Sequence, residues 1–169
     1  MATATGFTRG TLEEIFQRDG NGALRGLRDD AFEQFEAMPM PSPETEEWRY
    51  TDLREFDLSQ FTPFAEEPMA ETLDDVKPDL LEAAGQVGDR SGLAIQHNST
   101  VVTSHLDPAE AAKGVIFTSL DEAAQDHGDL LENRLHAIVP TGRTKFTAMH
   151  GAFRTGGTFV HVPAGIKVE

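Results

Sequence analysis

The sequence TFVHVPAGIKV, residues 158–168, decides how the fold is interpreted. Its first five residues have the composition of a β-strand, a Pro-Ala-Gly corner follows, and the last three residues begin a second strand. Two short strands joined by a tight corner do not form a stable sheet alone. The segment is therefore expected either to begin a longer structure that is cut at Glu169 or to pair with the strands expected between residues 93 and 117.

The first part of the chain is predicted to be helical. Thr11 and Glu14 match a capping box that begins a helix to about Arg18. A second helix is predicted over 23–38, because apolar residues recur there at spacings of three and four: Leu24, Leu27, Ala31, Phe32, Phe35 and Met38. We assign residues 1–61 to this N-terminal helical region.

The composition changes twice after this region. Residues 62–91 form an acidic, linker-like stretch, because the part up to about residue 78 is rich in Pro, Glu and Asp and has little periodicity. From residue 92 the pattern indicates a mixed α/β section to residue 155, and residues 156–169 begin a separate β core. The sequence therefore predicts an α+β fold.

Short elements with clear boundaries make up the mixed section. Residues 92–103 match a β-hairpin, and residues 115–117 match a short buried strand. Helices are expected to follow the cap residues Asp107 and Ser119, to cover roughly 130–138, and to begin again after Thr141.

Charge and composition exclude several classes of function. The 169 residues carry 29 acidic and 14 basic side chains, a formal net charge of −15, which repels nucleic acids and anionic membranes. An acidic surface with so few lysines is typical of a high-salt cytoplasm, and the alternative is an acidic surface without a special habitat. The chain has no cysteine, so it contains no disulfide or thiolate metal site. Without a signal peptide or an apolar span, the protein is expected to be cytoplasmic.

No catalytic, cofactor-binding or metal-binding residues are predicted. The histidines do not show the i, i+4 spacing of a helical zinc site, and each is expected to be structural or solvent-facing: His97, His105, His127, His136, His150 and His161. Phosphate-binding loops and nucleophile elbows are also missing from the sequence. A small metal-dependent hydrolase built from distant histidines and acids is the least favoured alternative.

The motif Trp48-Arg49-Tyr50-Thr51 is the main candidate site. Trp48 and Tyr50 are the only Trp and Tyr in the chain, and each combines an apolar ring with a polar tip. Arg49 can stack on one ring or pair with a neighbouring acid. One interpretation is that the rings fasten the proline-rich segment to the 23–38 helix, and the other is that they form a contact surface for another protein.

Three stretches resemble the SufB/SufD family of the SUF iron–sulfur cluster assembly system. LRDDAFEQFEAMPMPSPETEEWRYTDL (27–53) and GVIFTSLDEA (114–123) are similar to its SufD branch, where a helix and a Pro-x-Pro turn precede a Glu-x-Trp-Arg/Lys-Tyr-Thr motif. KFTAMHGAFRTGGTFVHVPAGIKVE (145–169) is similar to a segment shared by both branches. It departs from the family pattern at residues 149–151, where Met-His-Gly replaces Leu-Asn-x.

The resemblance implies a non-catalytic scaffold subunit of a SufBCD complex. Its expected partners are a SufB-like paralogue and a SufC-like ATPase, and the full complex rather than this segment handles the iron–sulfur cluster. The family's corner at residues 163–165 leads into a parallel β-helix, which this chain would enter only at its first strands. A free-standing acidic interaction module is the alternative to this function.

Overall fold

The computed structural model describes residues 6–18, 24–63, 73–84, 90–97, 100–131 and 134–168. Contacts within the chain group into two units, each built from two separate segments. The first unit combines Met1–Phe64 with Gly128–Arg154, and the second combines Ala65–His127 with Thr155–Glu169. The consecutive division predicted from composition remains a prediction, and the units are described here one at a time.

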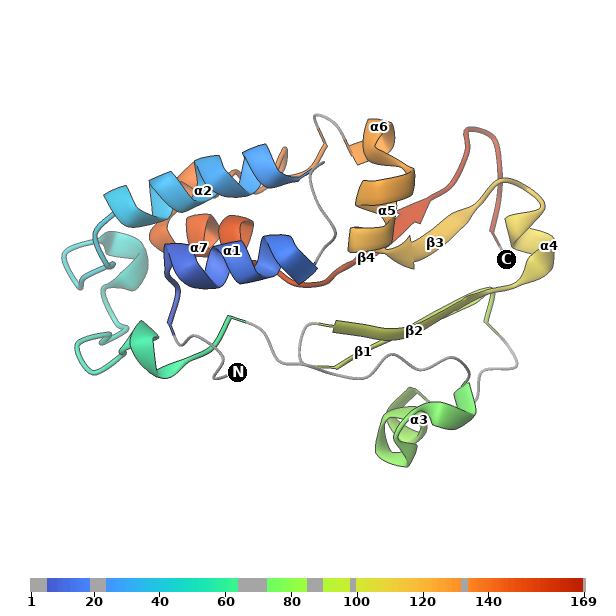
Figure 1. Ribbon diagram of the computed structural model, residues 1–169, viewed down its shortest axis with the longest axis horizontal. Helices are drawn as coiled ribbons and strands as arrows, with labels where there is room; N and C mark the ends of the chain where they lie inside the picture. Colours follow the sequence, from blue (N-terminus) through green and yellow to red (C-terminus); the bar gives the residue numbers. More distant parts are fainter. Residues whose placement is uncertain are drawn as a thin grey trace. The chain divides into compact units, whose positions relative to one another are not determined.

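Three helices form the core of the first unit: α1 (Arg9–Arg18), α2 (Arg25–Ala37) and α7 (Lys145–Phe153) (Figure 1). Their apolar faces bury Leu12, Ile15, Phe16, Ala31, Phe32, Phe35, Ala148, Ala152 and Phe153. The Phe153 ring lies edge-on to the rings of Phe7, Phe32 and Phe35, with centroid distances of 5.2 to 5.9 Å. This geometry is favourable for aromatic pairs, so α7 closes a core that α1 and α2 begin.

Two of the predicted helix caps were wrong, each by three residues. The Thr8 amide donates to Thr11 Oγ1, and the Thr11 amide donates to Thr8 Oγ1, so Thr8 caps α1 and Thr11 lies fully buried one turn later. Likewise, Thr144 rather than Thr141 caps α7, through a reciprocal pair with Thr147. Both caps use threonine where a capping box usually has Glu or Gln, which explains why the pattern was missed.

Helix α2 confirms the predicted stripe with one exception. Leu24, Ala31, Phe32 and Phe35 are buried, but Leu27 is 44% exposed at the edge of the stripe. Arg28, one turn after Leu24, is buried instead.

Helices α2 and α7 approach closely where Gly151 faces α2. A Cβ atom at Gly151 would overlap Thr141 Cγ2 and lie 3.0 Å from Ala31 Cβ. The Lys145 ammonium donates to the carbonyls of Phe35 (2.6 Å) and Met38 (2.7 Å), which are acceptors left open at the end of α2. Burial lowers the pKa of Lys145. A segment more than a hundred residues away in sequence therefore completes the end of α2.

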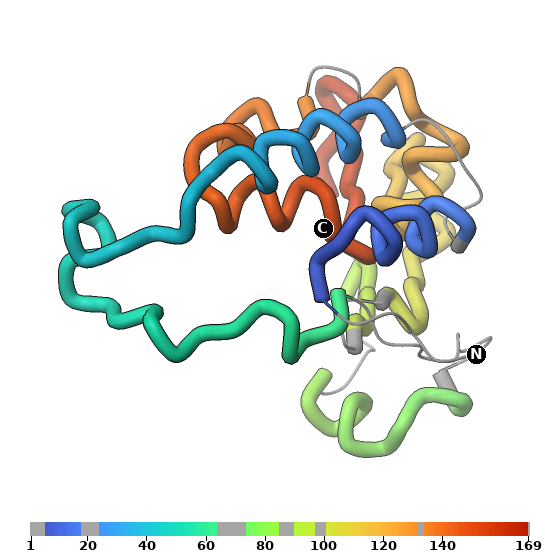
Figure 2. The backbone as a smooth tube through the Cα atoms, turned by 60° about the vertical axis from the view of Figure 1, so that its left-hand side comes forward, coloured from blue at the N-terminus to red at the C-terminus, as the bar shows by residue number. Residues whose placement is uncertain are grey.

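An irregular loop follows α2 over residues 38–63 (Figure 2). It contains the short 3-10 helices η1 (Glu46–Trp48) and η2 (Leu58–Gln60). After α6 (Gly128–Leu131) the chain continues through turns to η5 (Thr141–Arg143). The helix predicted over about 130–138 is thus shorter than expected, and His136 within it has a left-handed φ of 62°.

A hairpin is the centre of the second unit. Strand β1 (Gly92–His97) pairs antiparallel with β2 (Thr100–Leu106), which confirms the predicted hairpin. Within the stretch predicted as a linker, η3 (Leu73–Asp75) and α3 (Pro78–Ala84) are ordered elements. Leu80, Leu81 and Ala84 pack against a cluster of Val76, Leu93, Ile95 and Val102. The rest of that prediction, residues 64–72 and 85–89, lies outside the described residues.

The second sheet settles how residues 158–161 pair within the described chain. Strand β4 (Thr158–His161) pairs antiparallel with β3 (Ile116–Ser119). Helix α4 (Pro108–Ala111) precedes β3 and α5 (Leu120–Asp126) follows it, with the predicted caps at Asp107 and Ser119. Residues 166–168 do not form the expected strand. The fold is mixed α+β with two antiparallel sheets, and the parallel β-helix remains a prediction.

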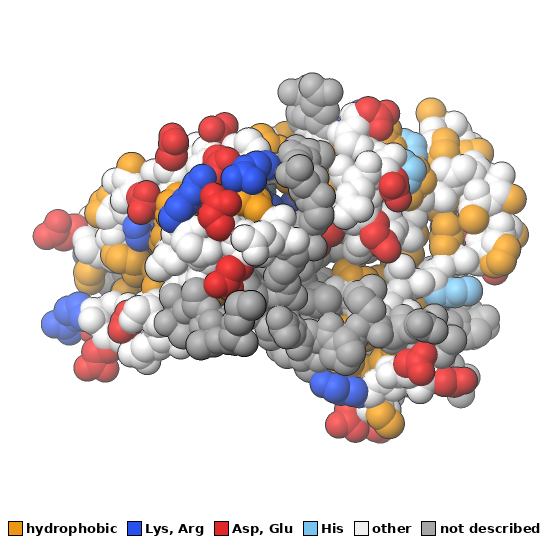
Figure 3. All heavy atoms as spheres, in the orientation of Figure 1, with side chains coloured by type: hydrophobic (Ala, Val, Ile, Leu, Met, Phe, Trp, Pro, Cys, Tyr) orange, Lys and Arg blue, Asp and Glu red, His pale blue; other side chains and the backbone are white. Residues whose placement is uncertain are grey.

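Acidic and basic side chains alternate over α1 and α2 (Figure 3). Arg9 lies 2.6 Å from Asp29, and Arg25 lies 3.2 Å from Glu13. In the part of the chain that the structure describes, no helix has both the length and the apolar character needed to cross a bilayer.

Candidate functional site

The structure separates the four residues of the Trp-Arg-Tyr-Thr motif. Trp48 ends η1 and is half-buried, with its ring centroid 5.2 Å from that of Phe146 on α7. Arg49, Tyr50 and Thr51 are exposed, and Tyr50 is 92% accessible to solvent. Trp48 therefore packs on Phe146 of α7, whereas the anchoring interpretation placed it on the 23–38 helix, and Tyr50 projects from the surface.

Charged side chains surround the start of the motif. The Arg49 guanidinium lies 5.7 Å from the centroid of the Tyr50 ring and 3.6 Å from Glu46. Glu47 pairs with Arg143 of η5 at 3.2 Å. Both contacts expected for Arg49, with a ring and with an acid, are therefore present. Both ion pairs are solvent-exposed, so each contributes little to stability.

A neighbouring pair shows a stronger electrostatic effect. Asp52 accepts three hydrogen bonds from the Arg54 side chain, two of them from Nε and one from Nη2, and a further one from the Arg54 amide. These bonds lower the pKa of Asp52 to about 2. Thr51 is followed by this Asp52 turn and not by a helix.

Aromatic rings continue from the motif along the surface of the first unit. The Phe56 ring lies 6.1 Å from Phe146 and 5.5 Å from Phe61. Phe56 and Phe61 are 41% and 47% exposed. We call Trp48, Phe56, Phe61 and Phe146 the aromatic row. Partly exposed aromatic side chains of this kind are enriched in protein interfaces.

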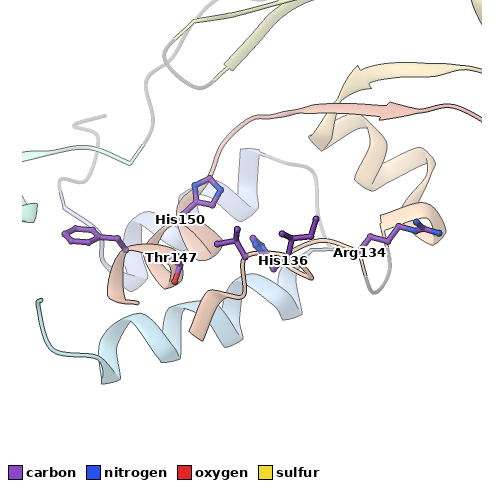
Figure 4. Close-up of a pocket in the computed structure, with 7 residues that line it drawn as sticks. Arg134, His136, Thr147 and His150 are labelled. Carbon is purple, nitrogen blue, oxygen red and sulfur yellow. The ribbon is translucent and has the colours of Figure 1, made fainter. Parts of the chain in front are cut away.

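Phe146 also lines a pocket of about 460 Å³ in the same unit (Figure 4). Ile138 and Val139 form apolar parts of its wall. The polar lining residues are Arg134, His136, Thr147 and His150. Figure 4 shows Arg134 at one end, His136 beside it, and Thr147 with His150 farther along. A smaller cavity of about 200 Å³ lies next to Trp48, between the proline-rich turn and the start of α7.

The two histidines of the pocket meet across fourteen residues of sequence. Their ring centroids are 6.4 Å apart and the rings are nearly perpendicular. Burial lowers the pKa of His136, and the charges of Arg154 and His150 lower it further. Burial also lowers the pKa of His150, again with a contribution from Arg154. Both shifts favour the neutral form of the imidazole.

Sequence reasoning missed this pocket because it depends on tertiary contacts. His136 lies in a loop with a left-handed backbone, and His150 lies on α7. The other described histidines lie elsewhere, for example His127, which stacks on Phe159 in the second unit. Among the described residues, no group of three or more His, Asp or Glu side chains is arranged to hold a metal ion.

Comparison with known proteins gives a consistent family. The family described as "SufBD protein N-terminal region" matches residues 87–169. The iron–sulfur cluster assembly protein SufD of Bacillus subtilis is 31% identical over 150 residues, which cover 86% of this chain and 33% of that protein. The SufB protein of the same organism is 26% identical over 174 residues, 97% of this chain and 36% of that protein.

A SufBD family protein of Staphylococcus saprophyticus is 28% identical over 175 residues, 95% of this chain and 36% of that protein. The chain thus spans about a third of the length of these relatives. No solved structure matches it. The resemblance seen in the sequence motifs is confirmed: residues 87–169 match the N-terminal region of the SufB/SufD family, and the similarity to its members extends over most of the chain.

Proposed function

We propose that this chain is the N-terminal part of a SufD-type scaffold subunit that acts in iron–sulfur cluster assembly. The observation that carries the proposal is the match of residues 87–169 to the SufBD N-terminal region. The assignment to SufD rather than SufB is supported by the higher identity to SufD, 31% against 26%. It is also supported by the SufD-like motif that ends at Leu53.

In this proposal the subunit works in the cytoplasm within a complex. Its partners are a SufB-like paralogue and a SufC-like ATPase, and the complex rather than this segment holds the cluster. The subunit is not itself an enzyme. The parallel β-helix implied by the family would follow the corner at residues 163–165. Tyr50, with 92% of its surface exposed, is the side chain of the motif best placed to contact a partner.

Affinity purification from the source cell tests the assignment. The chromosomal gene is tagged, and the expected result is co-purification of the SufB-like and SufC-like proteins in fixed ratio. Depletion of the protein should lower the activity of an iron–sulfur enzyme such as aconitase, whereas a dehydrogenase without a cluster should be unaffected. Equal loss of both activities, or purification without either partner, would contradict the proposal.

The contact role of the motif is tested in the same cells. Tyr50→Ala should reduce the recovered partners, because it removes an exposed aromatic ring of the kind that dominates interfaces. Gln17→Ala on the exposed face of α1 is the matched control and should leave recovery unchanged. Unchanged recovery with Tyr50→Ala would remove the motif from the interface while leaving the family assignment intact.

A further inference from the structure

The pocket of the first unit combines apolar walls with unused hydrogen-bond donors. Neither the His136 nor the His150 imidazole has a hydrogen-bond partner among the described residues. Thr147 is already engaged, because its hydroxyl lies 2.9 Å from the Thr141 carbonyl and 2.8 Å from the Thr144 carbonyl. The donors open to a ligand are therefore the two imidazoles and the exposed Arg134 at the end of the pocket.

The charges around these donors select the sign of a ligand. The described residues that line the pocket include no carboxylate. The Arg154 guanidinium is close enough to lower the pKa of both histidines. Among the described lining residues the Arg134 guanidinium is the one charged group, and a positive charge there disfavours a metal cation or an amine and favours an anion. In a chain with a net charge of −15, a pocket lined by cationic and neutral donors contrasts with the rest of the sequence.

The apolar lining residues indicate the size and character of the uncharged part of the ligand. Phe146, Ile138 and Val139 line a space of about 460 Å³, within the size range of small-molecule sites. Ile138 is 94% exposed and Val139 is 50% exposed, so both present apolar surface at the mouth of the pocket. His136, whose backbone φ is left-handed, lies two residues before Ile138 in the sequence. Such a conformation is costly for a residue with a Cβ atom and is common at functional sites.

We propose that this pocket binds a carboxylate carried on a small apolar body, with the carboxylate bonded to His136 and His150 and the body against Phe146. Arg134 then lies at the rim, where it attracts the anion. Two sources supply this chemistry: a free organic acid, or the C-terminal carboxylate of a polypeptide that ends in an aliphatic residue. The proposal does not depend on the place of the subunit in a complex.

Ligand titration followed by NMR on the purified chain tests the site. The probes are N-acetyl-leucine and its uncharged analogue N-acetyl-leucinamide. The expected result is a saturable shift of the His136 and His150 ring protons with an affinity of about 1 mM for the acid, as befits so small a ligand. The amide should bind at least about tenfold more weakly, because it lacks the charged acceptor. Equal binding of acid and amide, or no saturable shift, overturns the proposal.

A second readout comes from the histidines themselves. A bound carboxylate favours the protonated imidazole, so N-acetyl-leucine should raise the titration midpoints of His136 and His150, and the amide should not. Unchanged midpoints at saturating acid would place the ligand elsewhere and overturn the assignment of the donors.

Matched arginine variants localise the charge effect. Arg134→Gln should weaken acid binding several-fold, whereas Arg90→Gln, which removes an equally exposed charge in the second unit, should not. The circular dichroism melting curves of both variants should match the unchanged protein, because neither side chain is buried. If the two variants weaken binding equally, general charge rather than this pocket attracts the acid, and the proposal fails.

A leucine-terminated hexapeptide and the Ile138→Ser variant separate the two sources. If the peptide binds about tenfold more tightly than N-acetyl-leucine and Ile138→Ser removes that gain, the exposed Ile138 contacts the longer ligand and a polypeptide end is the source. If peptide and free acid bind equally and Ile138→Ser changes neither, the source is a free acid. Both outcomes support the carboxylate site.

Discussion

Trp48 and Tyr50 lie two residues apart, yet they have different physical environments. The Trp48 ring is half-buried against Phe146, whereas Tyr50 is almost fully exposed. Similar composition therefore does not imply a similar role. The sequence left two roles open for these rings, anchoring the loop or contacting another protein, and the structure places Trp48 against Phe146 and leaves Tyr50 exposed.

This difference predicts unequal effects of truncation. Trp48→Ala should lower the free energy of unfolding by about 1–2 kcal/mol, since half an aromatic side chain and one ring pair are lost. Tyr50→Ala should change it by less than about 0.5 kcal/mol. Urea unfolding followed by circular dichroism measures both, because the first change removes the only Trp. Equal midpoints for the two variants would show that the Phe146 contact does not stabilise the fold.

The histidine pair predicts a pH dependence with a defined sign. Because folding lowers the pKa of His136 and of His150, the unfolded chain binds more protons below about pH 6.5, and stability falls as the pH decreases through this range. Replacing both by Gln should flatten the stability profile between about pH 7.5 and 5.5. His105→Gln, on the exposed edge of the hairpin, is the control. An unchanged slope in the double variant would contradict the lowered pKa values of the two histidines.

At the scale of elements, α2 and α7 depend on a small residue where they meet. Gly151→Ala should lower the free energy of unfolding by about 1–3 kcal/mol, because its methyl group would collide with Thr141. Gly26→Ala on α2 is the matched control: no atom lies within 4 Å of the added methyl group, so the variant should gain about 0.5–1 kcal/mol from helix propensity. Thermal and urea unfolding compare the two. If both variants were more stable than the unchanged protein, α2 and α7 could move apart without a loss in the free energy of unfolding.

Local signals predicted elements well when partner residues were close in sequence. The hairpin at residues 92–106 and the capped helix after Ser119 follow from strand composition and a capping box within a few residues. The caps of α1 and α7 were misplaced because a threonine at the third position can form the same reciprocal bonds as Glu or Gln. The partner of α2 could not be predicted, since periodicity identifies an apolar face and not what covers it.

The candidate pocket could not be predicted for the same reason, because its residues come together only through tertiary contacts. Neither His136 nor His150 lies in a metal-site or catalytic motif, and their meeting depends on how the loop before η5 returns to α7. The exposed Ile138 was expected within a helix, where it would have packed inward.

For the whole molecule, the net charge of −15 predicts a response to salt. Raising KCl from about 0.1 to 1 M shortens the screening length from about 10 to 3 Å, which weakens the repulsion among carboxylates. The free energy of unfolding should therefore rise at pH 7, although exposed pairs such as Arg9–Asp29 weaken. Near the isoelectric point of about 4.7 the gain should largely disappear. A fall in stability with salt at pH 7 would show that the ion pairs outweigh the net charge.

The division of the first unit between two distant segments has a consequence for synthesis. Helices α1 and α2 leave the ribosome well before α7, and the second unit's hairpin is made in between. At about 5–20 residues per second, roughly 5–20 s pass between the synthesis of α2 and the synthesis of Phe153, whose ring covers the apolar faces of α1 and α2. During this delay the nascent chain exposes Phe32 and Phe35 to chaperones and to other nascent chains. The order of translation therefore makes the hairpin, rather than the helical core, the first part able to complete its own contacts.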